Sequence, residues 1–377
     1  MTTDRVRYAQ PQVAPGAVAA ARGVLLPRID LARGRIDLNH GAGGRATAQL
    51  VAQLFEPALR NPYLNTSDDA AVVPGLVLGQ EAGGADADRL VIACDAHVVS
   101  PIFFPGGDLG SLAVYGTLND LAVMGARALY LSAAFIMEEG FPLADLDRLA
   151  RSMGAAARAA GVAIVTGDTK VVERNKADGV FITTTGIGLR APGVTLSSRA
   201  ARVGDRILVS GSIGDHGVAV ISRRESFAFE TEIVSDSADL TPLVMDLLEA
   251  GSSGLRLLRD PTRGGLATAL NEIAHSAQLS MQIHEEALVI SPQVRAACEL
   301  LGLDPLYIAN EGKLLAICSP EAAPAILRAM QGHRLGAQAA MIGEVCAGEP
   351  GSVMMQTRLG GWRMLDWLAG DPLPRIC

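Results

Sequence analysis

The sequence has 377 residues, of which 49% are hydrophobic and 19% are charged, so it predicts a folded globular protein rather than a disordered chain. At this length two domains are expected. The formal net charge of -8 and the lack of a basic stripe argue against a nucleic-acid partner. No apolar run reaches the roughly 18 residues that a membrane helix needs, and the N-terminus has no signal-peptide pattern, so no membrane partner is expected.

The five cysteines are an odd number and show no Cys-x-x-Cys spacing; they are Cys94, Cys298, Cys318, Cys346 and Cys377. This pattern predicts reduced thiols and therefore a cytoplasmic protein. Aromatic residues make up only 4% of the chain, whereas glycine occurs 41 times. The core is therefore expected to consist of small aliphatic side chains, with glycine loops between the elements.

Residues 1–34 are rich in Ala, Arg and Pro, and we expect them to form an N-terminal extension. Strand-like and helix-like runs then alternate over residues 35–195, which predicts a first α/β domain. The predicted strands are 35–38, 90–94, 129–137, 162–166 and 180–187, and the predicted helices are 46–55, 109–124 and 143–160.

A stretch containing Pro, Gly and Ser at 191–202 is typical of a linker, and it precedes a second α/β domain over residues 196–346. Residues 347–377 are expected to form a C-terminal segment and tail. The predicted strands of the second domain are 206–210, 281–284, 313–318 and 340–345, and its predicted helices are 216–222, 240–249, 265–277, 292–301 and 321–330.

A glycine-rich segment at 39–44 follows the first predicted strand and leads into a helix. It contains His40, Gly41, Gly43 and Gly44. Glycines let the backbone approach a ligand closely, and free N–H groups at a helix start suit phosphate oxygens. The segment lacks the spacing of the known phosphate loops, so a tight strand-to-helix turn is an equal alternative.

Acidic side chains recur beside apolar runs, where a solvated surface does not explain them. A buried carboxylate needs a partner, and a hard cation with phosphate oxygens provides one. Each Asp alone is more often a cap or a turn residue, but together they favour Mg²⁺-nucleotide binding. The positions concerned are Asp68, Asp69, Asp95, Asp120 and Asp168, with Asn119 beside Asp120 in a largely apolar helix.

Two residues are candidates for handling a proton or a phosphate. Lys170 follows the Gly167-Asp168-Thr169 run after a predicted strand, and it is either a functional lysine or an ordinary surface one. Glu311 lies in a polar quartet between two apolar runs, where a surface role is harder to defend. A further cluster at 260–265 precedes a helix, and there a structural role through a Thr262 cap is credible.

The chain ends in Cys377, ten residues after Trp367 in the last apolar segment. An extended arm of that length spans roughly 30 Å, and Pro372 and Pro374 disfavour helix and keep the arm extended. The thiol could then visit its own cleft or that of a partner. A frayed end whose last residue happens to be Cys is the alternative.

Taken together, these motifs resemble the ATP-binding PurM-like superfamily. The resemblance rests on residues 40–44, 67–71, 100–108, 119–122 and 167–170. Within the superfamily, the Ser-Pro-x-Phe-Phe-Pro-Gly-Gly run at 100–107 and the terminal Pro-Arg-Ile-Cys look like the HypE family of carbamoyl dehydratases, which act in nickel-iron hydrogenase maturation. The resemblance covers residues 35–377 in uninterrupted order.

The resemblance implies a homodimer of two PurM-like α/β domains per subunit, with a mixed sheet in the N-terminal ATP-binding domain and a flexible C-terminal tail. It implies that Cys377 receives a carbamoyl group from a HypF-type carbamoyltransferase. The enzyme then dehydrates this group to a thiocyanate with ATP and Mg²⁺, releasing ADP and phosphate. Cyanide passes to iron held by a HypC-HypD-type complex.

Residue roles follow from the same resemblance. The catalytic set is Cys377, Glu311, Lys170 and His40, with Glu311 or Lys170 as the base that removes the N–H proton. The nucleotide-binding set is Gly41, Gly43, Gly44, Asp69, Asn119, Asp120, Gly167, Asp168 and Thr169. Mg²⁺ is expected on some of Asp68, Asp69, Asp95, Asp120 and Asp168.

Two alternatives stay open. The chain could be another ATP-using member of the superfamily that acts on a small molecule, such as a selenophosphate synthetase, a thiamine-phosphate kinase or an aminoimidazole ribonucleotide synthetase, although none of these needs a terminal thiol. It could also be a non-catalytic scaffold whose tail docks a maturation partner. Glu311→Ala discriminates, because a scaffold tolerates it and a dehydratase does not.

Overall fold

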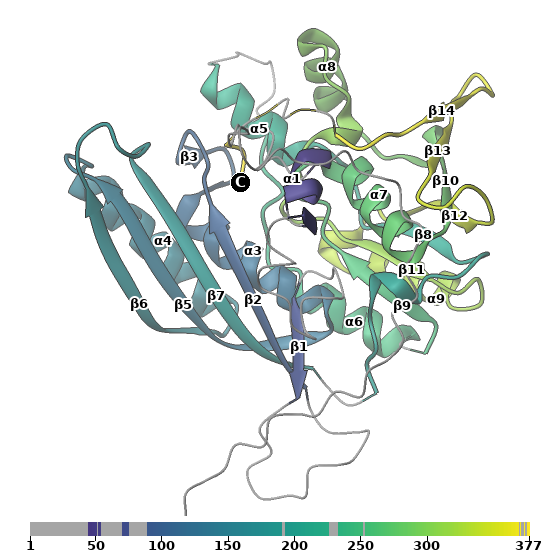
Figure 1. Ribbon diagram of the computed structural model, residues 1–377, viewed down its shortest axis with the longest axis horizontal. Coiled ribbons are helices and arrows are strands. Elements are labelled where there is room, and N and C mark those ends of the chain that lie inside the picture. Colours follow the sequence, from purple (N-terminus) through teal and green to yellow (C-terminus); the bar gives the residue numbers. More distant parts are fainter. Residues whose placement is uncertain are drawn as a thin grey trace, which may run out of the picture.

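The computed structural model describes residues 44–50, 52–53, 70–74, 89–190, 193–225, 233–251, 253–368, 370, 373 and 375–377. The predicted N-terminal extension and the strand expected at 35–38 lie outside these residues. The helix expected from residue 46 begins at the same place, as α1 (Arg45–Leu50). Two sheets, each covered by helices, make up the described chain (Figure 1).

The N-terminal sheet has five strands in the order β1-β2-β7-β5-β6. Only β5 and β6 run parallel, and the other neighbours pair antiparallel, so the sheet is mixed as expected. Helices α3 and α4 cover one face of this sheet (Figure 1). The elements are β1 (Ala71–Pro74), β2 (Arg89–His97), α3 (Leu109–Val123), β5 (Ala126–Glu138), α4 (Leu143–Ala159), β6 (Ala163–Val172) and β7 (Val180–Arg190), with the short pair β3 (Phe103–Phe104) and β4 (Gly107–Asp108) before α3.

Helix α3 is the centre of the molecule. Asp108 caps its first turn by accepting hydrogen bonds from the N–H groups of Gly110 and Ser111. Twelve of its 15 residues are buried, so it is apolar on almost every side rather than on one stripe. A Cβ at Gly110 would lie 2.3 Å from the carbonyl oxygen of Leu149, so glycine allows α3 and α4 to pack closely.

The C-terminal sheet has seven strands in the order β14-β13-β10-β12-β8-β11-β9, all antiparallel except β10 with β13. Four short 3₁₀ segments lie at 198–200, 285–287, 305–307 and 334–336. The elements are β8 (Arg206–Val209), α5 (Asp215–Arg224), α6 (Thr241–Gly251), β9 (Leu255–Arg259), α7 (Gly265–Ala277), β10 (Ser280–His284), α8 (Pro292–Leu301), β11 (Leu315–Cys318), α9 (Ala323–Gly332), β12 (Ala340–Cys346), β13 (Val353–Gln356) and β14 (Trp362–Met364).

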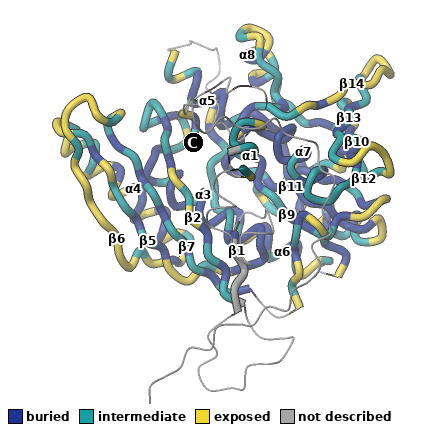
Figure 2. The backbone as a smooth tube through the Cα atoms, viewed as in Figure 1, coloured by how far each residue is buried: buried dark blue, intermediate teal, exposed yellow. Residues whose placement is uncertain are grey.

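Alternation along the central strands sorts side chains between the two faces of this sheet. Leu315 and Ile317 of β11 join the core under α7, whereas Ala316 and Cys318 join the core under α6 and α9. Both faces are covered, which is why β8 and β11 read as continuous apolar runs. Figure 2 shows the buried centre of this layer and the exposed loops at its rim.

Helices α5 and α8 pack against the N-terminal domain rather than on the C-terminal sheet. Their residues Val218 and Val294 share a core cluster with Leu109 of α3, and the same cluster contains Ile376. The C-terminus therefore lies beside β3 and α5, between the two sheets (Figure 1). No helix within the described ranges is both long and apolar enough to cross a membrane.

The structure extends two of the predicted strands. The strand predicted at 90–94 continues to His97, so Asp95 lies within β2 and not after it. The strand predicted at 162–166 continues to Val172, which places residues 167–170 inside β6. Backbone hydrogen bonds to neighbouring strands continue there although the side chains are polar. The sequence analysis did not predict β1, β3, β4, β9, β13 and β14, whereas α7 and α8 have the predicted bounds.

Candidate functional site

A cavity of about 260 Å³ opens between the two domains. Strand β2 and helix α3 of the N-terminal domain form one wall. The segment between β9 and α7, helix α7 itself, the turn before β11 and the chain end form the other. The lining residues are Cys94, Asp95, Ala96, His97, Gly116, Asp120, Arg259, Asp260, Thr262, Arg263, Ala269, Glu272, Glu311 and Cys377.

Strand β2 and helix α3 aim two carboxylates into this cavity. Asp95 and His97 alternate with Ala96 and face α3, as strand geometry requires. A Cβ at Gly116 would lie 2.8 Å from His97 Cε1 and 3.2 Å from Asp95 Oδ2, so only glycine leaves room there. Asp120 lies one helical turn after Gly116, on the same side of α3.

His97 orients Asp95 from within the core. Its Nε2 lies 3.5 Å from Asp95 Oδ2 and 3.2 Å from Thr184 Oγ1. Burial lowers the pKa of His97, and the neighbouring Asp95 opposes that shift only in part. We therefore assign a neutral imidazole at this position near pH 7.

The chain end and Glu311 meet inside the cavity. The Cys377 thiol and the Glu311 carboxyl group both line it and interact with each other. Burial raises the pKa of the Cys377 thiol well above its usual value, and the adjacent Glu311 raises it further. Burial also raises the pKa of Glu311 well above the usual value, with Asp260 and Asp95 acting in the same direction. Thiol and carboxyl group thus hold their protons more tightly than they would in water.

Arg263 supplies positive charge to the same cavity. The electrostatic interaction with Cys377 is the largest cause that raises the pKa of Arg263, and interactions with Asp95, Glu311 and Asp120 act in the same direction against burial. A guanidinium group in this position is suited to bind a phosphate or a polarised carbonyl oxygen. The sequence analysis noted the 260–265 cluster and held a structural role to be credible, because nothing in the sequence showed how close Arg263 comes to Cys377.

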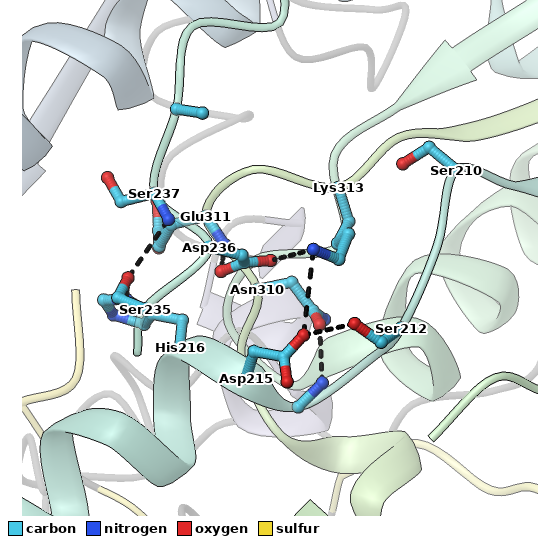
Figure 3. A network of polar contacts seen from close by, with 12 residues as sticks. Ser210, Ser212, Asp215, His216, Ser235, Asp236, Ser237, Asn310, Glu311 and Lys313 are labelled. Atoms are coloured by element: carbon cyan, nitrogen blue, oxygen red, sulfur yellow. Dashed lines mark hydrogen bonds and ion pairs between the residues drawn. The ribbon is translucent and has the colours of Figure 1, made fainter. Parts of the chain in front are cut away.

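A buried ionic network fixes the turn that carries Glu311 (Figure 3). Lys313 Nζ lies 3.3 Å from Asp236 Oδ2 and 3.8 Å from Asp215 Oδ2. The backbone N–H of Glu311 donates to Asp236 Oδ1 at 3.0 Å. A Cβ at Gly312 would lie 1.8 Å from the carbonyl oxygen of Asp236, so only glycine permits this approach.

The structure brings four of the predicted site residues together and places others elsewhere. Cys377, Glu311, Asp95 and Asp120 line the one cavity. Asn119 is fully buried, and its side chain bonds to backbone groups of the C-terminal domain. Gly44 packs against the carbonyl of Leu368, and His40, Gly41, Gly43, Asp68 and Asp69 lie outside the described residues.

Four predicted residues lie on β6, away from the cavity: Gly167, Asp168, Thr169 and Lys170. Lys170 Nζ lies 3.5 Å from Asp168 Oδ2, and both side chains are largely exposed. The structure thus separates Lys170 from Glu311 within one chain. In the part of the chain that the structure describes, no group of three or more His, Cys, Asp or Glu side chains is arranged to hold a metal ion.

The last residues of the chain are docked in the chain's own cleft, one of the two places that the extended arm was expected to reach. Ile376 forms an antiparallel bridge with Val99 and is buried, as is Leu373. The apolar side chains of the tail are buried on docking, which offsets the loss of chain freedom. His216 was not among the predicted site residues, yet its ring is hydrogen bonded to the backbone carbonyl of Ile376.

Two family models match the chain. The N-terminal domain of the AIR synthase related proteins matches residues 67–190, and the C-terminal domain of the same group matches residues 202–356. Together they span more than half of the sequence.

Similar proteins carry more specific names. "Carbamoyl dehydratase HypE" of Rhizobium leguminosarum bv. viciae is 57% identical over 93% of this chain and 97% of its own. A crystal structure of hydrogenase maturation protein HypE in complex with ATP is 47% identical, covers 91% of this chain and 100% of its own, and superposes with a TM-score of 0.74. A HypE-HypF complex is 42% identical, covers 84% and 99%, and has a TM-score of 0.76.

Proposed function

This chain belongs to the family of HypE carbamoyl dehydratases, and we propose that it dehydrates a carbamoyl group on its own Cys377 to a thiocyanate. The observation that carries the proposal is the position of Cys377 beside the buried Glu311, in a cavity that Arg263 also lines. A thiol at the end of a chain has few reasons to enter such a cavity unless it carries the reacting group. The product supplies the cyanide ligand of a nickel-iron hydrogenase.

The reaction balances with ATP as the acceptor of the carbamoyl oxygen. In the S-carbamoyl group, R–S–C(=O)–NH₂, the oxygen takes the γ-phosphoryl group and ADP leaves. The nitrogen then gives up its two protons, and phosphate departs with the oxygen, leaving R–S–C≡N. The sum is S-carbamoyl plus ATP to thiocyanate, ADP and phosphate. Without phosphorylation the amide oxygen is too poor a leaving group.

Residues in the cavity have distinct tasks in this scheme. Glu311 lies against the Cys377 sulfur, so it is placed to take a proton from the carbamoyl nitrogen. Its raised pKa makes the ionised form a stronger base than an ordinary carboxylate. Arg263 is placed to stabilise charge on the phosphorylated oxygen. The covered cavity limits hydrolysis of the activated amide by water.

ATP binding is proposed at the cavity and the glycine segment before α1, with the nucleotide-binding residues named from the sequence. The donor set fits Mg²⁺, because Asp95 and Asp120 both present carboxylate oxygens to the cavity. Phosphate oxygens and Asp68 or Asp69 would complete the coordination, and Asp168, on the uncovered face of β6, could contribute only to the site of a second copy. A bound Mg²⁺ ion neutralises charge that develops during phosphoryl transfer.

A homodimer is supported by the uncovered face of the N-terminal sheet. Tyr130 and Ile136 of β5 are 51% and 40% exposed, which is unusual for large apolar side chains on a sheet. Asp168 and Lys170 pair with Ala134 and Ile136 in register and share this face. A second copy that covers the face would meet Lys170, so we propose that Lys170, if it acts as the base, serves the partner's site.

Two protein partners are proposed from the chemistry and from the relatives. Carbamoyl transfer to Cys377 requires a carbamoyltransferase, and a relative of this chain has been crystallised as a HypE-HypF complex. A HypC-HypD-type complex is the proposed acceptor of the cyanide. All five cysteines are free, which supports a reducing cytoplasm as the location.

The competing functions are disfavoured by the docked chain end. A superfamily enzyme acting on a small molecule needs no thiol from its own terminus beside Glu311. A scaffold that only docks a partner needs no buried carboxyl group there, because burying an acid without function is costly. Neither alternative explains why Cys377, Glu311 and Arg263 converge.

Mass spectrometry of the intact chain and of its C-terminal peptide tests the proposal. The protein is incubated with a HypF-type carbamoyltransferase, carbamoyl phosphate and ATP. We expect an addition of about 43 Da at Cys377 from the carbamoyl group. This addition should fall to about 25 Da, the mass of a cyano group, only when this protein hydrolyses ATP. Cys346→Ser is the matched control and should behave as wild type. An unmodified Cys377 would return the terminal thiol to the status of a chain end without function.

A further inference from the structure

The last three residues are held by hydrogen bonds to their backbone oxygens, in addition to the contacts of the Cys377 sulfur. The N–H of Val98 donates to the terminal oxygen of Cys377 at 3.0 Å, and the N–H of Ser100 donates to the carbonyl of Arg375 at 3.0 Å. Val99 and Ile376 form the antiparallel bridge between these two bonds. The chain end thus adds a short strand beside residues 98–100, and these bonds do not depend on what the sulfur carries.

His216 holds this strand from the C-terminal domain. Its Nε2–H donates to the carbonyl of Ile376 at 2.7 Å, which leaves Nδ1 to accept from the Ser235 hydroxyl at 2.8 Å. Ser235 Oγ in turn accepts from the N–H of Ser237 at 3.1 Å, so its proton is directed to the imidazole. The ring also packs edge-on against Phe104, with centroids 5.4 Å apart.

Arg224 bridges the two sides of the strand pair. Its Nε donates to the carbonyl of Ser100 and its Nη2 to the carbonyl of Arg375, both at 2.7 Å. Arg375 has a φ of 57°, a left-handed conformation that costs a residue other than glycine intrinsic stability. The bonds from His216 and Arg224 help to offset this cost in the docked tail.

The segment that contacts His216, residues 235–236, also supports Glu311. Ser235 touches His216, and the adjacent Asp236 accepts the backbone N–H of Glu311 at 3.0 Å (Figure 3). One short stretch of chain thus contacts the residue that holds the tail and the turn that carries the carboxyl group facing Cys377. Docking of the tail and alignment of Glu311 therefore share one support.

We propose that His216 and Arg224 are positioning residues that form a latch on the tail backbone. The latch holds Cys377 against Glu311 whatever group the sulfur carries, and its opening frees the same thiol for a partner. The latch rests on the proposed function for its purpose, since a carrier thiol must be held for one step and released for another. Its existence is testable without that chemistry.

Alkylation of the full-length protein by iodoacetamide measures how often Cys377 leaves the cavity. The rate at Cys377 is read from the C-terminal peptide by mass spectrometry, with Cys346 on β12 as the internal reference. Arg224→Met and His216→Phe should each raise the Cys377 rate roughly tenfold, as expected for loss of one or two hydrogen bonds. Arg223→Met, next to Arg224 on α5 but exposed, should leave the rate unchanged.

Wild-type alkylation rates in Arg224→Met, with an unchanged melting temperature, would overturn the latch. Arg224 is only half-buried, so this variant keeps the test decisive even if the fully buried His216 does not tolerate Phe. In carbamoylated protein, both variants should slow dehydration while the Kd for ATP stays the same. Faster alkylation without any conversion of a carbamoyl group would support the latch and contradict the proposed function, so the two failures are distinguishable.

Discussion

The side-chain amide of Asn119 donates a hydrogen bond to the backbone carbonyl of Glu311 at 3.3 Å, and so joins helix α3 of one domain to the turn before β11 of the other. The same amide donates to the carbonyl of Ala238 at 3.1 Å, and its oxygen accepts from the N–H of Leu240 at 2.9 Å. Both ends of the amide are thus used in holding the domains together. The nucleotide contact predicted for Asn119 stays a prediction.

Asn119→Ala should destabilise the protein and misplace Glu311. Removing the amide leaves buried backbone groups without partners, at a cost of about 2 kcal/mol in the free energy of unfolding. Urea unfolding measures this cost, and single-turnover kinetics of carbamoylated protein measure dehydration, which should slow. Asn271→Ala is the matched control, because Asn271 is equally buried and bonds to Ala267 and Leu365 away from Glu311. Equal loss of dehydration in both variants would refute a specific link.

Glu311→Gln should abolish most dehydration and flatten its pH dependence. Glu311 acts as a base only when ionised, and burial raises its pKa, so the wild-type rate should rise with pH above the range of an ordinary glutamate. Loss of a general base lowers the rate by about 100-fold or more, whereas carbamoylation of Cys377 should persist. Glu344→Gln, on β12, serves as control. If the Glu311→Gln protein kept the wild-type pH profile, Glu311 would not be the base.

Lys313→Met should cost more stability than an exposed charge deletion. The change leaves the nearly buried carboxylate of Asp236 without its cation, which costs about 3 kcal/mol when one partner of a buried pair is removed. Thermal or urea unfolding measures the effect. Arg151→Met breaks an exposed pair with Asp147 and should change stability little. Similar losses in the two variants would show that the Lys313 network contributes no more than a surface pair.

Ile136→Glu should convert the proposed homodimer to a monomer. A charge on the uncovered sheet face would have to be buried without a partner on association. Sedimentation velocity at several concentrations measures the mass. Leu359→Glu, at a side chain 98% exposed in the C-terminal domain, should keep the wild-type mass. A dimeric Ile136→Glu protein would exclude this face from the interface.

Prediction from sequence succeeded where the pattern is local. The helices at 265–277 and 292–301 have the predicted bounds, because each has a strong apolar periodicity and glycine or serine at its start. It was wrong where neighbours decide the outcome. Residues 167–170 look like a turn by composition but pair with β5 as part of a strand, and β9 was not recognised as one.

The motifs and the terminal cysteine, read from the sequence alone, indicated the family, two α/β domains and a candidate set with Cys377 as the carrier and Glu311 or Lys170 as the base. These features depend on residue type and order, which a linear pattern preserves. Only the tertiary structure decided that Arg263 joins this set, that Lys170 lies on another face, and that His216 and Arg224 hold the tail. These relationships join positions far apart in the sequence, and the bonds from His216 and Arg224 reach backbone carbonyls, which are alike at every residue, so no pattern of side chains records them.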